Sequence, residues 1–341
     1  MANKKPTLKD IANVLNISTA AVSKAMQGNS RISDKTKQAV KKVAEELNYQ
    51  PNHLASALRK GKSNLVGVIV PRTNSNFFSS VIENIEEVLN KKGYQIIITQ
   101  SNESYKRECA NIDTLLFTQV DGIIASMANE TTDLSYFEKI KSKEIPLILF
   151  DRGENDLNVD YIGINDYDCS HLIIAHLVSQ GKKRIGHIGG FSRSRIFNNR
   201  IRGYIDAIKK YNLPSDGELL LESSLTLEDG REKMLQLLAL NNPPDAVYVA
   251  GDYAALGALQ VLQENNIAIP DSMAIVGFGN EPFTGIVTPS LSTINQHSDK
   301  IGRLAAETFL ALVEKTYLKQ SLNKQILTAE LIVRDSSRIL T

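Results

Sequence analysis

The chain has 341 residues, which is the length of at least two compact domains, and its 42% hydrophobic and 23% charged residues are ordinary for a globular protein. No apolar run approaches the ~20 residues that span a bilayer, and no apolar region of a secretory signal follows the basic residues at the N-terminus. We therefore expect a cytoplasmic protein without a membrane partner. Cys109 and Cys169 lie far apart, which argues against a disulfide framework or a CxxC metal site.

The net charge of +1 conceals a strong asymmetry along the chain. Residues 1–62 hold twelve Lys and Arg against four Asp and Glu, a local charge of +8, whereas the remaining 279 residues hold 27 against 34, or −7. A compact basic segment on a mildly acidic body is typical of a nucleic-acid-binding module attached to another domain. A solvated basic arm is the alternative interpretation.

Three short helices are predicted in chain order within this basic segment. Thr7 and Asp10 have the spacing of a capping box, which predicts a helix that runs to about Leu15. Ser18 is a good N-cap for a second helix, and Ser33 starts a third. The apolar positions that would form one small core are Ile11, Ala12, Leu15, Ile17, Val22, Ala25, Val40, Val43, Ala44 and Leu47.

The second helix, predicted from Thr19 to Met26, has the features of a DNA reader. Two short helices joined by a tight turn form a helix-turn-helix, in which the start of the second helix presents side chains to base edges. The outward-facing positions there are Thr19, Ala20, Ser23 and Lys24. Generic three-helix domains share this pattern, so it does not decide the function alone.

The segment after the third helix helps to decide between a generic three-helix domain and a DNA-binding one. Tyr49-Gln50-Pro51-Asn52 is followed by HLASALRKG, and the chain also contains TLKDIANVLNISTAAVSKAM near its start and LIVRDSS near its end. In combination these motifs resemble the lactose-repressor (LacI/GalR) family over nearly the whole chain.

The resemblance implies a small all-α helix-turn-helix head plus a hinge helix, joined to a two-lobed α/β body of type I periplasmic-binding-protein-like fold. The implied boundaries are 1–50 for the head, 51–62 for the hinge and 63–341 for the effector-binding and dimerisation domain, with lobes of about 63–162 plus 293–322 and about 163–292 plus 323–341. The implied DNA-binding residues are Thr7, Ser18, Thr19, Ala20, Ser23, Lys24, Asn52, His53, Ala55 and Leu58. Leu58 would be an apolar wedge in the minor groove.

The body itself supports an α/β fold. Short β-branched runs alternate with helical stretches, which is typical of parallel sheets with crossover helices. These runs are LVGVIV, QIIIT, DGIIAS, PLILF, RIGHIG, DAVYVA and MAIVGF.

Motifs of enzymes are missing from the sequence. It has no GxGxxG, GxxxxGK[ST] or GxSxG motif, and its five histidines are scattered. Asp151, Asp166 and Asp168 are close enough to suggest acid–base chemistry, but loops that follow parallel strands often carry such residues for ligand binding. We therefore expect no enzymatic activity, no cofactor and no metal site.

An effector site in the cleft between the lobes is a further implication of the resemblance. The implied contacts are Asn76, Phe78, Asp151, Arg200, Asp252, Asn280 and Glu281. Structural alternatives are a core position for Phe78, a cap or ion pair for Asp151 and a salt bridge for Arg200. Gly251 and Gly279 replace an Asn and an Asp of many relatives, so two familiar sugar contacts are missing.

The sequence therefore predicts a homodimeric transcriptional regulator, more specifically a repressor, that binds a pseudo-palindromic operator in double-stranded DNA. We expect a small-molecule effector, by family frequency a carbohydrate. The alternative is a soluble sugar-binding or sensor protein whose basic head has another partner. The C-terminus has no heptad pattern, so we expect no tail-mediated tetramer.

Overall fold

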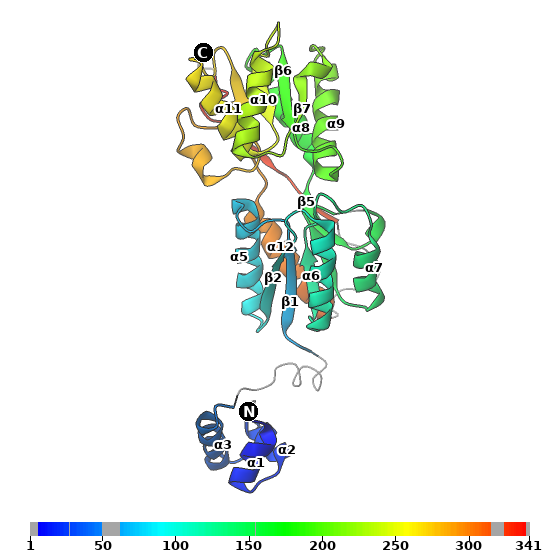
Figure 1. Cartoon of the computed structure of the whole chain (residues 1–341), viewed down its shortest axis with the longest axis vertical. Coiled ribbons are helices and arrows are strands. Elements are labelled where there is room, and N and C mark those ends of the chain that lie inside the picture. Colours follow the sequence, from blue (N-terminus) through cyan, green and yellow to red (C-terminus); the bar gives the residue numbers. More distant parts are fainter. Residues whose placement is uncertain (1–5, 27, 50–61, 154, 315–323, 339–341) are drawn as a thin grey trace. The chain divides into compact units, whose positions relative to one another are not determined.

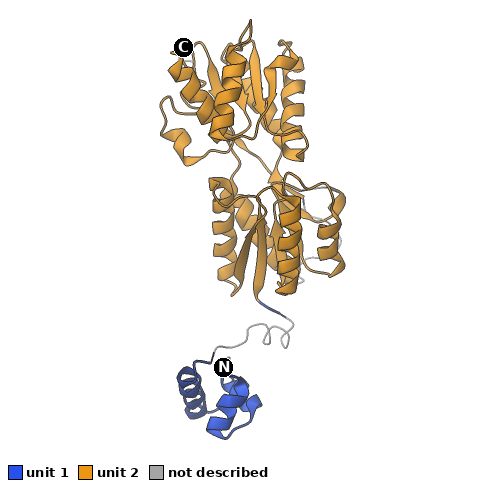
Figure 2. Cartoon of the chain, in the orientation of Figure 1, with its two compact units in different colours: residues 1–63 blue, residues 64–341 orange. Residues whose placement is uncertain are grey.

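The chain consists of two compact units, residues 1–63 and 64–341 (Figure 2). None of the helices in the described part of the chain is long and apolar enough to cross a membrane. The computed structural model describes residues 6–26, 28–49, 62–153, 155–314 and 324–338.

The described residues of unit 1 form three helices whose starts are capped as the sequence predicts. Ser18 Oγ accepts a hydrogen bond from the Ala21 backbone N–H at 3.1 Å, and Ser33 Oγ accepts one from the Thr36 N–H at 3.3 Å. Asn16 ends the first helix in the left-handed region, with φ of 52°. The helices are α1 (Leu8–Leu15), α2 (Thr19–Met26) and α3 (Asp34–Glu46).

The predicted small core of unit 1 is confirmed. Its buried residues are Ile11, Ala12, Val22, Ala25, Val40, Val43 and Ala44, and Leu15, Ile17 and Leu47 pack partly buried against them. The predicted hinge helix falls outside the described residues, together with the predicted DNA contacts Asn52, His53, Ala55 and Leu58.

The first lobe of unit 2 is built on a six-stranded parallel sheet in the order β11-β5-β4-β3-β1-β2. Figure 1 shows β1 and β2 of this sheet with helices of the lobe on either side. Alternate residues of β1 point to opposite faces: Val66 and Val68 pack with α5 and α12, and Ile69 packs with α6 and α7. The elements are β1 (Leu65–Val70), α5 (Asn76–Asn90), β2 (Gln95–Gln100), α6 (Tyr105–Phe117), β3 (Gly122–Ala125), α7 (Ser135–Ser142), β4 (Leu147–Phe150), β5 (Asp160–Ile164), α12 (Ser298–Val313) and β11 (Lys324–Leu327).

The second lobe repeats this design with a four-stranded parallel sheet in the order β7-β6-β8-β9. Helices α8 and α9 cover one face, and α10 and α11 cover the other. The elements are α8 (Asp166–Ser179), β6 (Ile185–Gly189), α9 (Arg195–Lys210), β7 (Leu220–Glu222), α10 (Leu227–Leu238), β8 (Ala246–Val249), α11 (Asp252–Glu264) and β9 (Ala274–Val276). An antiparallel pair, β10 (Thr293–Asn295) with β12 (Glu330–Ile332), and 3-10 turns at Asn155–Leu157, Gly217–Leu219 and Pro282–Gly285 complete the unit.

The chain crosses between the lobes later than the predicted positions near 162, 292 and 323. Strand β5 stays in the first sheet to Ile164, and β10 pairs with β12 before α12 returns to the first lobe. Strand β11 belongs to the first sheet because it extends the edge beside β5. The predicted lobe bounds were approximate, and the structure assigns Lys324–Leu327 to the first sheet.

Candidate functional site

The exposed face of α2 carries most of the predicted base contacts. Thr19, Ala20 and Lys24 are exposed, and Ser23 is half-buried, whereas Val22 on the opposite face is fully buried in the core. This distribution leaves the start of α2 accessible to a partner, as a helix-turn-helix requires.

Two other predicted DNA contacts stabilise helix starts. Asp10 Oδ2 accepts hydrogen bonds from the Thr7 backbone N–H at 2.7 Å and from the Thr7 hydroxyl at 2.6 Å. Ser18 is the N-cap of α2. Whether these residues also contact DNA stays a prediction.

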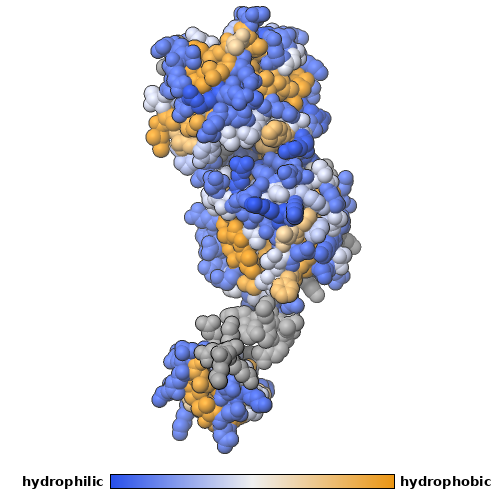
Figure 3. Space-filling view, in the orientation of Figure 1, coloured by the Kyte–Doolittle hydropathy of each residue, from blue (hydrophilic) through white to orange (hydrophobic). Residues whose placement is uncertain are grey.

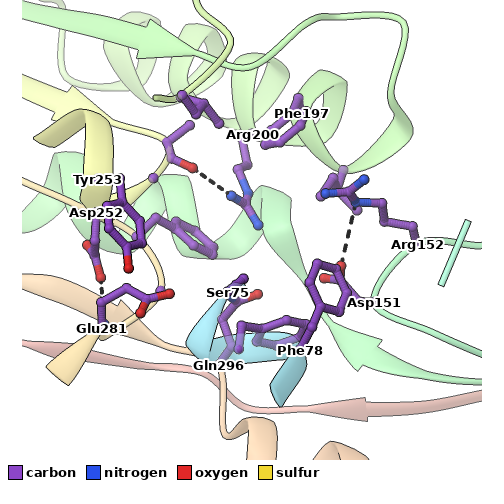
Figure 4. A pocket seen from close by; sticks show the side chains of 17 residues that line it. Ser75, Phe78, Asp151, Arg152, Phe197, Arg200, Asp252, Tyr253, Glu281 and Gln296 are labelled. Carbon is purple, nitrogen blue, oxygen red and sulfur yellow. Dashed lines mark hydrogen bonds and ion pairs between the residues drawn. The ribbon is translucent and has the colours of Figure 1, made fainter. Parts of the chain in front are cut away.

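A cavity of about 170 Å³ lies between the two lobes of unit 2 (Figure 4). Both lobes line it, because the carboxyl ends of the parallel strands and the helix starts of both sheets meet there. Five predicted effector residues line this cavity: Phe78, Asp151, Arg200, Asp252 and Glu281.

Arg200, on α9, is held by a buried ion pair. Its Nε donates to Asp166 Oδ1 at 2.8 Å, its Nη1 donates to the Ala250 carbonyl at 3.0 Å, and its guanidinium lies 3.5 Å from the ring centre of Phe278. Figure 4 shows the guanidinium end pointing into the cavity. Arg200 therefore lines the cleft, as the resemblance implies, and it also forms the salt bridge that was the structural alternative.

Asp151 follows β4 in a left-handed conformation, with φ of 56°, and its side chain is buried. Burial raises the pKa of this carboxyl to about 6, although the nearby Arg152 opposes the shift. Phe78 is also buried and contacts Phe150, so it is both a core residue and a cavity wall.

Asp252 and Glu281 form an acidic corner of the cavity. Asp252 Oδ1 accepts from the Thr293 hydroxyl at 2.7 Å, and Oδ2 accepts from the Glu281 backbone N–H at 2.8 Å. The backbone N–H groups of Asn76 and Phe77 at the start of α5 oppose the rise of the Glu281 pKa, so this carboxylate of the second lobe faces the first lobe. Burial raises the pKa of Asp252 to about 6 and that of Glu281 to about 7.

Gly279 is required by its backbone conformation. Its φ of +136° is one that other residues rarely adopt, and a Cβ there would lie 3.3 Å from Asp252 Oδ2. A glycine at this position therefore fits the path of the loop.

Two predicted effector residues do not line the cavity. The Asn76 side chain is exposed at the first turn of α5, and Asn280 Oδ1 accepts from Arg334 Nη2 at 2.9 Å. The positive φ of Asn280, 54°, and its hydrogen bond to Arg334 account for its position.

Sequence reasoning missed several residues that line the cavity. Most of them are next to a predicted residue in the chain or directly follow a strand. Either feature of the sequence would have indicated them as candidates. They are Ser75, Arg152, Phe197, Tyr253 and Gln296. In the described residues, no group of three or more His, Cys, Asp or Glu side chains is placed to hold a metal ion.

Comparison with known proteins decides the family. The model of "Bacterial regulatory proteins, lacI family" matches residues 7–52, and that of "Periplasmic binding protein-like domain" matches residues 174–337. The chain is 30% identical over 339 residues to a probable HTH-type transcriptional repressor, ExuR, of Bacillus subtilis, with 98% of this chain and 99% of the relative covered. The chain belongs to the LacI family.

Other members agree with this assignment. The ribose operon repressor of Haemophilus influenzae is 31% identical over 308 residues, covering 90% of this chain and 92% of the relative. The crystal structure of the lac repressor dimer bound to operator and the anti-inducer ONPF shares the fold, with a TM-score of 0.84, 23% identity and coverage of 98% and 99%. The CelR–cellobiose complex matches with a TM-score of 0.73, 23% identity and coverage of 97% and 100%. As a LacI-family protein, the chain is a DNA-binding transcriptional repressor, and its relatives ExuR and the ribose operon repressor are repressors, not enzymes.

Proposed function

We propose that this LacI-family repressor acts in the cytoplasm as a homodimer that binds a pseudo-palindromic operator and is controlled by a small-molecule effector, a carbohydrate, in the cavity between the lobes. The observation that carries the proposal is a cavity lined by both lobes in a chain that also contains a helix-turn-helix with an accessible reading face.

The DNA-binding part of the proposal rests on unit 1. The exposed side chains of α2 offer a hydroxyl at Thr19, a methyl group at Ala20 and an ammonium group at Lys24. These groups can contact base edges in the major groove, and the +8 charge of residues 1–62 attracts the phosphate backbone. A two-fold symmetric operator requires two such units, which motivates the homodimer.

The control part rests on the position of the cavity. Because both lobes line the cavity, a ligand in it has different contacts when the angle between the lobes changes, and it therefore favours one arrangement. The distance of the Glu281 carboxylate from the start of α5, whose backbone N–H groups oppose the rise of its pKa, also depends on that angle. In this proposal, a change in the angle between the lobes acts through the hinge segment on DNA binding by unit 1.

Carbohydrate chemistry fits the lining residues. The carboxyl groups of Asp151 and Glu281 accept hydrogen bonds from hydroxyls, the Arg200 guanidinium donates to oxygen, and the rings of Phe78 and Phe197 pack against the apolar face of a sugar ring. One structural relative is a complex with cellobiose, and one sequence relative is the ribose operon repressor.

Selection of random duplex DNA on the purified full-length protein tests the proposal. We expect an enriched inverted repeat whose affinity falls steeply with salt. Lys24→Ala should weaken binding to the repeat and relax its sequence at one position of each half-site. Lys41→Ala, which removes the same charge from exposed α3, is the matched control. Failure to enrich any sequence, with and without sugar mixtures, would contradict an operator reader.

A further inference from the structure

A second cavity, of about 250 Å³, adjoins the first between the two lobes. We call it the outer cavity, and the cavity described above the inner cavity. Both are lined by Phe78, Arg152 and Phe197, so they share a wall. The inner cavity reaches Gln296 next to a lobe crossing, whereas the outer cavity is lined by loops that follow β1, β2, β3, β4, β6 and β7.

Arg152 stands at the boundary between the cavities. Its guanidinium carbon lies 5.8 Å from the ring centre of Phe78 and 6.0 Å from that of Phe197, so it occupies the space between rings from opposite lobes. Neither cavity alone reaches the ~300 Å³ of a small ligand site, but the two together exceed it. The cleft therefore has room for a ligand of two parts.

The charges of the outer cavity favour an anion. Arg72 from the first lobe and Arg193 from the second are both exposed, and Arg193 forms no ion pair with any described residue. Arg72 Nε is 3.9 Å from Glu103 Oε1. Arg193 packs on the exposed Phe191 ring at 5.1 Å. Figure 3 shows strongly hydrophilic side chains along the boundary between the two lobes.

The acidic residues of the outer cavity are already engaged. Glu103 Oε2 accepts from Arg152 Nη1 at 2.7 Å and from the Asn129 backbone N–H at 2.9 Å. Glu130 Oε2 accepts from the Tyr105 backbone N–H at the positive start of α6. Glu222 accepts from the Ser192 N–H and lies near Arg193, but it does not line the outer cavity. The lining itself holds three arginines and two glutamates, an excess of one positive charge, with Glu222 just outside it.

One buried polar atom at the outer cavity, Asn129 Oδ1, lacks a hydrogen-bond partner among the described residues. Arg152 Nε also makes no hydrogen bond, but it pairs with Asp151 Oδ2 at 3.7 Å. An unpartnered buried polar atom is costly, so it indicates a polar ligand or ordered water at this place. The acceptor Asn129 Oδ1 suits a ligand hydroxyl, and the arginines suit an acidic oxygen.

We propose that the effector is an acidic, two-part sugar derivative whose anionic group, a carboxylate or a phosphate, binds in the outer cavity between Arg72 and Arg193. This inference rests on the proposed function, in that it takes the cleft to be the effector site. Guanidinium groups from opposite lobes would then close on one anion, which draws the lobes together.

The first experiment measures the melting temperature of the full-length protein against inorganic phosphate, with chloride at equal ionic strength as the reference. The wild type should show a saturable rise. Arg193→Gln and Arg72→Gln should each weaken the apparent phosphate affinity by about tenfold, because each removes charge-assisted hydrogen bonds. Arg107→Gln, an exposed arginine that lines neither cavity, should behave as the wild type. Identical phosphate curves for all four proteins would overturn the proposal.

A second experiment distinguishes the two acidic groups with matched sugars: glucose, glucuronate, glucose 6-phosphate and the neutral two-ring sugar cellobiose. Stabilisation by glucuronate or glucose 6-phosphate beyond that by glucose, lost in Arg193→Gln, would identify the anionic group. Stabilisation by the neutral sugars alone, unchanged in Arg193→Gln, would contradict the proposal. Neither experiment contains DNA, so a failure here is separate from a failure of operator binding.

Discussion

Replacement of Arg200 by methionine removes the cation that faces Asp166 inside the second lobe. The two side chains are each 5% exposed, and Arg200 Nε lies 2.8 Å from Asp166 Oδ1. Removing one member of a buried pair leaves an uncompensated charge, and such a loss costs about 3–5 kcal/mol of the free energy of unfolding. We expect Arg200→Met to be destabilised by this amount at neutral pH, besides losing any response to an effector.

The double variant Arg200→Met/Asp166→Asn separates the ion pair from the packing of the arginine. Because the double variant contains no buried charge at this place, its loss of stability should be smaller than the sum of the two single losses. The difference measures the coupling between the two side chains.

Urea unfolding followed by far-UV circular dichroism provides the free energies. Burial raises the pKa of Asp166 even beside Arg200. In Arg200→Met the folded-state pKa of Asp166 should rise further above its unfolded value of about 4. The loss of unfolding free energy relative to wild type should therefore be small near pH 4 and should grow as the pH increases. Strictly additive losses, or a deficit independent of pH, would refute the reasoning.

Three further predictions concern other parts of the chain. Leu58→Ala should weaken operator binding but spare nonspecific DNA, as a minor-groove wedge would, and equal loss on both DNAs in an anisotropy titration would exclude that role. Ser18→Ala removes the N-cap bond to Ala21 and should cost unit 1 about 1 kcal/mol by amide hydrogen exchange, with unchanged exchange contradicting the cap. Burial raises the pKa of Glu281 to about 7, so ionisation of this carboxyl lowers the free energy of unfolding of the wild type as the pH rises from about 4 to 7. Glu281→Gln lacks this titration, and its stability relative to wild type in urea titrations should therefore increase over that range. A difference that does not change with pH would show that Glu281 is not buried as described.

Much of the fold could be predicted because its signals are local. Continuous β-branched runs such as LVGVIV are typical of strands buried on both faces, and β1 occupies Leu65–Val70 as the run indicates. Caps such as Ser18 act within three residues, so the helix starts of unit 1 were also readable. Strands of three residues, such as β10 and β12, lack such a signal because their pairing partner is far along the chain.

The site was only partly predictable because its decisive contacts are distant in sequence. Asn280 is drawn away from the cavity by Arg334, 54 residues later, and Arg200 is held by Asp166, 34 residues earlier. Asp252 accepts from the Thr293 hydroxyl, 41 residues later. Residue type and spacing give candidates for a cleft, but side-chain partners decide which of them face it.

The central claim is that two copies of this chain read a two-fold symmetric operator. Anisotropy titrations of the selected inverted repeat and of its isolated half-site, at about 50 to 200 mM salt, test it most directly. We predict two chains per full repeat, much weaker binding to the half-site and a steep loss of affinity with salt. One chain per duplex, with equal affinity for the repeat and the half-site, would contradict the account.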